Sequence, residues 1–126
     1  MYGTMARILV IDDDGLTREI LKEILSPLGH DIVEARDGKE GVCCYLEPPS
    51  DLVITDIVMP EEDGLEAIQE IYEKNPLARV IAMTGFDGDG EMGYLALAKK
   101  LGASLTLKKP LHKDDVLSAV ETALAH

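Results

Sequence analysis

The sequence is poor in aromatic residues: among its 126 residues are four tyrosines, one phenylalanine and no tryptophan. The core of such a chain must therefore consist mainly of leucine, isoleucine and valine. No apolar stretch approaches the about 20 residues that a membrane-spanning helix requires, so the sequence does not predict a membrane protein. Residues 1–4 also lack the basic and apolar regions of a signal peptide, and we expect a soluble protein.

Cysteine is scarce too. Cys43 and Cys44 are the two cysteines of the chain, and because they are adjacent they cannot build a disulfide framework. We expect both to be reduced, buried thiols. We also expect the protein to be cytoplasmic, because thiols stay reduced in that compartment.

Positive charge is limited as well, because 12 lysines and arginines stand against 24 aspartates and glutamates, for a net charge of −12. Proteins bind nucleic acids and anionic membranes largely through lysine and arginine, so we expect neither kind of direct binding. The basic residues are unevenly distributed. From Met92 to Lys113 no acidic residue occurs, but there are five lysines: Lys99, Lys100, Lys108, Lys109 and Lys113.

Apolar runs alternate along the chain with segments of helical periodicity. We predict strands near residues 7–11, 31–35, 52–55, 80–83 and 104–107, and helices near 15–28, 38–47, 64–74, 91–101 and 113–125. Such alternation is typical of an α/β fold in which helices cover both faces of a parallel sheet. The length indicates one domain, comprising residues 1–126.

The first predicted helix shows this periodicity in two neighbouring apolar rows. One row contains Leu16, Ile20 and Ile24, and the other contains Leu21, Leu25 and Leu28. Apolar residues repeating at intervals of three and four predict an amphipathic helix.

Polar residues follow four of the predicted strands. Asp12 and Asp13 follow the first, Asp56 the third, Thr84 the fourth and Lys109 the fifth. The carboxyl ends of parallel strands meet at one edge of a sheet, where open α/β sheets bind ligands. Carboxylates suit a hard divalent cation such as Mg²⁺, and a lysine and a hydroxyl suit phosphoryl oxygens. The set predicts phosphoryl chemistry, with Asp56 as the acceptor.

A glycine-rich segment, residues 85–93, follows Thr84. Four of its nine residues are glycine, which predicts a loop. Asp87, Asp89 and Glu91 are spaced like the first ligands of a calcium-binding EF-hand loop. However, Met92 occupies the position of the required glycine and Ala98 that of the required glutamate, so this interpretation fails.

Several of these segments together resemble bacterial two-component response regulator receiver domains, over nearly the whole chain. The matching segments are residues 8–13, residues 56–60 with 63–64, Thr84, residues 102–103, and residues 109–110. The resemblance implies a three-layer, doubly wound, flavodoxin-like (βα)₅ fold with strand order 2-1-3-4-5. It further implies that Asp56 accepts a phosphoryl group from a sensor histidine kinase or a histidine phosphotransfer protein.

The same resemblance implies a magnesium site. Mg²⁺ would be bound by Asp13, Asp56 and the backbone carbonyl of Val58, with Asp12 acting through a water molecule. Thr84 and Lys109 would contact the phosphoryl group, and a cis Lys109–Pro110 peptide bond is expected. The protein would then be a signalling switch, catalysing only its own phosphorylation and dephosphorylation.

Two positions depart from the family pattern. Thr106 stands where a tyrosine or phenylalanine is usual, and Gly85 stands where alanine is usual. In receivers, phosphorylation changes the surface formed by helix 4, strand 5 and helix 5. We therefore expect the 85–93 loop, rather than an aromatic side chain, to respond. Lys99 and Lys100 on that surface predict an acidic downstream protein partner.

Two alternatives remain open. Residues 11–17 also resemble the aspartate-nucleophile motif of haloacid-dehalogenase-type phosphatases, with Asp12 as nucleophile, Asp14 as general acid, and Thr84 and Lys109 binding phosphate. That interpretation leaves residues 56–60 unexplained, and the chain has no room for a cap domain. The second alternative is a receiver-like binding module without phosphorylation, although the complete set of site residues weakens it. An acidic run such as 12–14 also favours a helix start without any catalytic role.

Overall fold

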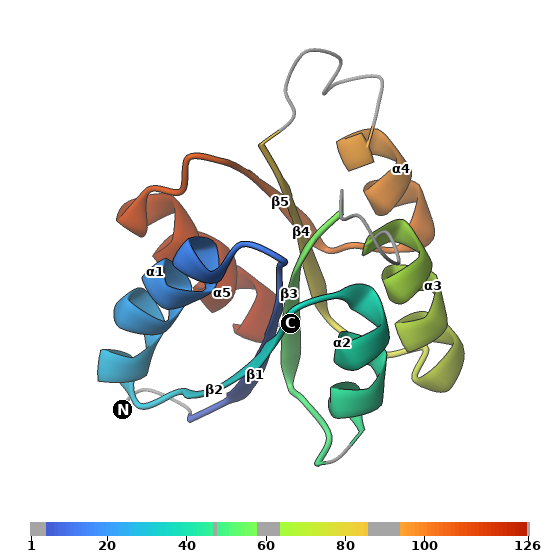
Figure 1. Ribbon diagram of the computed structural model, residues 1–126, viewed down its shortest axis with the longest axis horizontal. Helices are drawn as coiled ribbons and strands as arrows, with labels where there is room; N and C mark the ends of the chain where they lie inside the picture. Colours follow the sequence, from blue (N-terminus) through green and yellow to red (C-terminus); the bar gives the residue numbers. More distant parts are fainter. Residues whose placement is uncertain (1–4, 47, 58–63, 86–93, 126) are drawn as a thin grey trace.

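The five strands form one parallel sheet in the order β2-β1-β3-β4-β5 (Figure 1). The computed structural model describes residues 5–46, 48–57, 64–85 and 94–125. The strands are β1 (Arg7–Ile11), β2 (Asp31–Ala35), β3 (Leu52–Asp56), β4 (Val80–Thr84) and β5 (Leu105–Lys108). The helices are α1 (Gly15–Leu25), the 3₁₀ turn η1 (Ser26–Leu28), α2 (Gly38–Tyr45), α3 (Gly64–Lys74), α4 (Tyr94–Leu101) and α5 (Lys113–Ala125). The predicted doubly wound fold and its strand order are confirmed.

Alternating side chains of the sheet build two apolar cores, one on each face. On β1, Ile8 and Val10 face α1 and α5, whereas Leu9 and Ile11 face α2, α3 and α4 (Figure 1). All four side chains are completely buried. A strand covered by helices on both sides must be apolar throughout, which is why the predicted strands read as continuous apolar runs. Among the described residues, no helix has both the length and the apolar character needed to cross a bilayer.

Two helices are shorter than predicted. α1 ends at Leu25 and continues as the 3₁₀ turn Ser26–Leu28. Pro27 lies within that turn and lacks the backbone N–H that another α-helical turn would need. α2 ends at Tyr45 rather than at residue 47. The observed α4 begins at Tyr94, and residues 91–93, where we predicted its start, lie outside the described residues.

The strand ends differ slightly from the predicted ones, and the differences involve the site. β3 and β4 each extend one residue further, so that Asp56 and Thr84 are the last residues of their strands. β5 runs from Leu105 to Lys108 instead of over 104–107. The backbones of Asp56 and Thr84 are therefore held by the sheet itself, and their side chains start from rigid positions.

Of the two apolar rows of α1, the one with Leu21 and Leu25 is buried, whereas the start of the other is exposed. The helix buries Thr17, Leu21 and Leu25, whereas Leu16 is 68% exposed and Ile20 is 37% exposed. The buried row thus begins with a polar residue, whose hydroxyl donates to the Asp14 carboxylate. An exposed apolar row remains near the start of the helix.

The prediction of two buried thiols is wrong for Cys43, which is exposed, and Cys44 is only half-buried. α2 buries Gly38, Gly41 and Tyr45, which recur at helical spacing on one face. Cys43 lies two positions from both Gly41 and Tyr45, and two positions along a helix lead to the opposite side. The orientation of α2 on the sheet therefore decided the exposure of Cys43.

Gly64 begins α3 directly against the end of β3. A Cβ atom at this position would overlap the backbone oxygen of Asp56 and the backbone of Ile57. The Gly64 N–H donates to the carbonyl oxygen of Ile57 at 3.3 Å. Glycine is required here because only a residue without a side chain lets α3 approach the backbone of Asp56.

Candidate functional site

Three of the predicted site residues lie on the same face of the sheet at its carboxyl edge. Asp12 directly follows β1, Asp56 ends β3 and Lys109 directly follows β5. Asp12 and Lys109 are still tied to neighbouring strands, because the Asp12 N–H donates to Ala35 at 3.1 Å and the Lys109 N–H donates to Thr84 at 2.8 Å. By strand alternation all three side chains point to the face that α1 and α5 cover.

Lys109 bridges the two carboxylates. Its Nζ atom lies 2.8 Å from Oδ2 of Asp12 and 3.4 Å from Oδ2 of Asp56. Asp12 is completely buried and Asp56 is 6% exposed. Asp56 lies 44 positions after Asp12 in the sequence, and Lys109 lies 97 positions after it. The three residues thus form one charged cluster from distant parts of the chain. The contact between Lys109 and the two aspartates confirms that the fold gathers these strand ends.

The charges in this cluster do not balance, and the pKa directions follow from that. Burial raises the pKa of Asp12, and the negative charge of Asp56 adds to the increase, while Lys109 and the Asp14 N–H oppose it. Burial alone would lower the pKa of Lys109, but the hydrogen bond and charge of Asp12 and the charge of Asp56 raise it overall. One lysine pairs with two carboxylates. The attraction of both carboxylates outweighs the effect of burial on Lys109, whereas the attraction of Lys109 does not outweigh the effect of burial on Asp12.

The donor set fits a hard divalent cation. Carboxylate oxygens of Asp12, Asp13 and Asp56 all lie within 4.8 Å of one another. Oδ1 of Asp12 accepts from the Asp14 N–H at 2.9 Å, whereas Oδ2, apart from its ion pair with Lys109, accepts no hydrogen bond in the described part of the chain. Oxygen ligands with excess negative charge are typical of Mg²⁺ and Ca²⁺ sites. The exposed side chain of Asp13 leaves the cluster accessible to solvent.

Thr84 reaches the same edge from β4. It is 1% exposed and follows Met83, whose backbone pairs with Asp56 in the sheet. By strand alternation its side chain starts on the face that α2, α3 and α4 cover, opposite to Asp56. The next residue, Gly85, is exposed, and a Cβ atom there would make an ordinary 3.5 Å contact with the side chain of Lys109.

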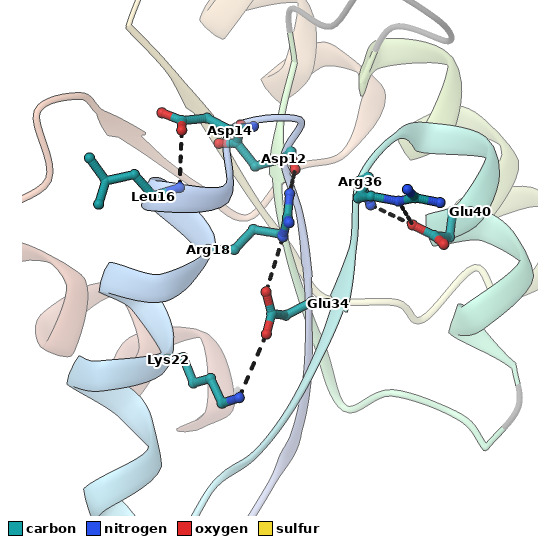
Figure 2. Close-up of polar contacts among 8 residues, drawn as sticks. All are labelled: Asp12, Asp14, Leu16, Arg18, Lys22, Glu34, Arg36 and Glu40. Atoms are coloured by element: carbon teal, nitrogen blue, oxygen red, sulfur yellow. Dashed lines mark hydrogen bonds and ion pairs between the residues drawn. The ribbon is translucent and has the colours of Figure 1, made fainter.

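Asp14 has a structural role. It is the N-cap of α1: one carboxylate oxygen accepts from the Leu16 N–H at 3.0 Å, and the other accepts from the Thr17 hydroxyl at 3.1 Å. Figure 2 shows the contact with Leu16 at the first turn of the helix. Because both oxygens are engaged, Asp14 is poorly placed to act as the general acid of a phosphatase. Here the interpretation of an acidic helix start holds.

Sequence reasoning did not identify Arg18. Its Nη1 donates to the backbone carbonyl of Asp12 at 2.7 Å, and its Nε donates to Glu34 on β2 at 3.0 Å (Figure 2). The available signal was its position one helical turn after Asp14, on the side of α1 that returns towards the site. Which acceptor the guanidinium finds depends on the neighbouring strand.

Three of the predicted switch residues lie on α4 and β5. Lys99 and Lys100 are exposed in the last turn of α4, and Thr106 is half-buried on β5. Lys108 is exposed at the end of β5. Val58, a predicted metal ligand through its carbonyl, lies outside the described residues, as do residues 86–93 of the predicted loop.

Comparison with known proteins agrees with this geometry. Residues 8–121 match the model of the response regulator receiver domain family. The chemotaxis protein CheY of Listeria monocytogenes is 39% identical over 120 residues, which cover 94% of this chain and 98% of the relative. Close similarity over almost the full length of both chains indicates a shared family and not only a shared fold.

Solved structures support the same relationship. A response regulator receiver domain protein from Clostridium thermocellum has a TM-score of 0.86 at 34% identity, covering 96% of this chain and 95% of the other. CheY in the CheX–CheY–BeF₃–Mg complex of Borrelia burgdorferi has a TM-score of 0.83 at 31% identity, covering 93% and 87%. This chain therefore belongs to the family of CheY-like response regulator receiver domains.

Proposed function

We propose that residues 1–126 form a single phosphoacceptor receiver domain of a two-component or phosphorelay system. Asp56 accepts a phosphoryl group from a sensor histidine kinase or a histidine phosphotransfer protein. The observation that carries the proposal is the position of Lys109 Nζ, 2.8 Å from Asp12 and 3.4 Å from Asp56. This cation lies where an incoming phosphoryl group would meet the acceptor carboxylate.

The proposed reaction moves one phosphoryl group. A carboxylate oxygen of Asp56 forms a bond to phosphorus, while the bond between phosphorus and the donor nitrogen breaks. Because the acceptor and the phosphoryl group are both anionic, positioning and charge neutralisation are the main requirements. Lys109 supplies a positive charge, and the Thr84 hydroxyl donates a hydrogen bond to a phosphoryl oxygen. The protein acts as a switch and not as an enzyme with a separate substrate.

The proposed cofactor is Mg²⁺, held by Asp13, Asp56 and the Val58 backbone carbonyl, with Asp12 acting through water. When bound, Mg²⁺ neutralises part of the negative charge that gathers at the acceptor. The convergence of three carboxylates within 4.8 Å supports this assignment. The solvent exposure of Asp13 supports it too, because Mg²⁺ usually keeps several water ligands.

The central experiment is labelling with a small phosphodonor. We expect acetyl phosphate and Mg²⁺ to phosphorylate the protein at Asp56, as located by mass spectrometry, and we expect Asp56→Asn to abolish the label. A label on Asp12 that survives in Asp56→Asn would instead indicate the phosphatase-like chemistry. A folded, Mg²⁺-binding protein that takes up no label would indicate a binding module without phosphorylation.

Partner binding uses two different surfaces in this proposal. The exposed apolar side chains of Leu16 and Ile20, on the helix that follows the acidic cluster, offer a surface to the phosphoryl donor. The surface of α4, β5 and α5 changes with phosphorylation and binds a downstream partner. A CheY relative forms a complex with CheX in Borrelia burgdorferi, which supports a protein partner as the output.

Lys99 and Lys100 add positive charge to the output surface, and the contribution of this charge to partner binding can be tested. An acidic partner surface would be attracted electrostatically, and such attraction is screened beyond about 8 Å at physiological ionic strength. We expect association with the downstream partner to slow as salt is raised, and to slow further in the double variant Lys99→Glu and Lys100→Glu. Stopped-flow association rates insensitive to both changes would place the output surface elsewhere.

A further inference from the structure

Arg18 joins three elements of the fold at the carboxyl edge of the sheet. It extends from α1, donates through Nη1 to the backbone carbonyl of Asp12 at 2.7 Å, and donates through Nε to Glu34 on β2 at 3.0 Å. Lys22, one turn further along α1, lies 3.7 Å from the other oxygen of Glu34. Figure 2 shows these contacts in line along the gap between α1 and β2. The side chain of Arg18 is only 16% exposed.

The Asp12 carbonyl belongs to the peptide group that connects Asp12 to Asp13. Holding this peptide group restrains the backbone on either side of it, from which both carboxylates extend. Asp12 is also held by Lys109 and by the Asp14 N–H. Asp13 is exposed at the surface, and Arg18 holds the carbonyl of the peptide group that contains the Asp13 N–H.

The guanidinium group is suited to this role by its shape. Two different nitrogens of Arg18 serve two acceptors that come from different strands, and its planar fork keeps both bonds in fixed directions. A lysine at position 18 would carry the same charge but only one nitrogen. Charge and geometry at this position can therefore be separated by substitution.

We infer that Arg18 is a positioning residue for the metal site: through the Asp12 carbonyl it orients the Asp12–Asp13 pair so that Mg²⁺ binds tightly. This inference rests on the Mg²⁺ site of the proposed function and deepens it. Groups that orient metal ligands without touching the metal commonly change metal affinity by about 10- to 100-fold when removed.

A positioning role and a simple charge effect predict opposite changes in Mg²⁺ affinity when Arg18 is replaced. Arg18 is a cation close to a cation site, so through-space repulsion alone predicts tighter Mg²⁺ binding when its charge is removed. Loss of orientation predicts weaker binding. The sign of the change in Arg18→Gln therefore distinguishes the two, and Arg18→Lys, which keeps the charge, isolates the geometry.

The test measures Mg²⁺ affinity by isothermal titration calorimetry on the unphosphorylated protein. We expect about tenfold weaker binding in Arg18→Gln and a weakening of the same sign in Arg18→Lys. We also expect the amide resonance of Asp13 to shift in both variants before Mg²⁺ is added. Thermal unfolding measurements check that each variant is folded at the titration temperature. If Arg18→Gln is unfolded there, Arg18→Lys alone tests the inference.

Arg36→Gln provides the matched control. Arg36 follows β2 at the same edge of the sheet and pairs with Glu40 at 3.5 Å, but its side chain is 75% exposed and its contacts remain on β2 and α2 (Figure 2). We expect this variant to bind Mg²⁺ like the wild type.

Three results would overturn the inference. They are tighter Mg²⁺ binding in Arg18→Gln, unchanged affinity in Arg18→Lys, and an equal loss of affinity in Arg36→Gln. In each case a wild type that binds Mg²⁺ and is labelled at Asp56 keeps the proposed function intact. A wild type that does not bind Mg²⁺ overturns the inference and the proposed metal site together.

Discussion

The carboxyl edge of the sheet carries two buried carboxylates and a lysine, whereas the amino edge is closed by tyrosine hydroxyls. At the carboxyl edge, one ammonium group lies within 3.4 Å of both Asp12 and Asp56. At the amino edge, where the helices end, the Tyr72 hydroxyl donates to the Gly102 carbonyl at 2.6 Å. There the Tyr45 hydroxyl also accepts from the Asn75 amide at 2.9 Å.

Burial has different consequences at the two edges. It raises the pKa of Asp12 and also the pKa of Tyr72. Tyrosine is neutral at pH 7 in any case, so the higher pKa of Tyr72 costs nothing at that pH. Asp12 must be charged to attract a cation, and its higher pKa shows that the fold disfavours that charge. Burial thus disfavours the charged form of Asp12 at the carboxyl edge, whereas at the amino edge it favours the neutral form that Tyr72 has at pH 7.

The largest effect on stability is expected from a glycine that connects the site to α3. Gly64→Ala places a methyl group into the backbone of Asp56 and Ile57, so we expect a loss of about 3 kcal/mol in the free energy of unfolding. Labelling of Asp56 should slow as well, because the acceptor backbone must move. Urea denaturation and a labelling time course measure both.

Gly85→Ala is the control for this change at the same edge. Its methyl group would make an ordinary 3.5 Å contact with Lys109, so we expect stability to change by less than about 1 kcal/mol. Equal destabilisation by the two alanines would show that close packing at Gly64 is not the cause.

At the amino edge, Gly102→Ala should reduce stability without affecting the chemistry. Gly102 has a φ of +117°, and a Cβ atom there would lie 3.1 Å from the ring of Tyr72. We expect a loss of about 2 kcal/mol in unfolding free energy, because an L-residue is strained at this φ. Asp56 labelling should remain at the wild-type rate. A slower labelling rate would contradict the separation of the two edges.

Tyr72→Phe tests the amino edge more gently and adds a pH dependence. It removes the hydrogen bond to Gly102, so we expect a loss of about 1 kcal/mol at pH 7. Because burial, and then Tyr45, raise the folded pKa of Tyr72, its contribution is complete below the unfolded pKa of about 10 and is lost as pH rises through the folded pKa. The difference between wild type and variant in alkaline unfolding should therefore shrink. A constant difference would refute this assignment.

The smallest effect on stability is expected from Asp12→Asn, and unlike the preceding variants it should stabilise the protein. The folded pKa of Asp12 is raised, so its stabilising contribution is present at low pH and lost as pH rises through that pKa. At pH 7 without Mg²⁺, the neutral asparagine should give a slightly higher melting temperature than the wild type, and Asp56 labelling should slow. The gain should disappear as the pH is lowered and Asp12 is protonated. A lower melting temperature at pH 7 would show that the pairing with Lys109 outweighs the burial of the charge.

Much of the site was predictable from local sequence. Apolar runs of strand length, interrupted by segments of helical period, determine where β1 to β5 lie, because burial on both faces requires apolar side chains. In four of the runs, a polar residue at or directly after the end marks the carboxyl end of the strand. For that reason Asp12, Asp56, Thr84 and Lys109 could be assigned to one edge, where the structure brings Lys109 into contact with both aspartates.

Tertiary structure decided which way each helix turns on the sheet. On α1 the apolar rows offered several faces, and packing chose the one with Thr17, which leaves Leu16 exposed. On α2 the same choice exposed Cys43. Arg18 finds the Asp12 carbonyl and Glu34 because α1 lies across β1 and β2. Sequence periodicity is a local property of the backbone, whereas these contacts depend on how distant segments pack against one another, and the packed fold alone brings them together.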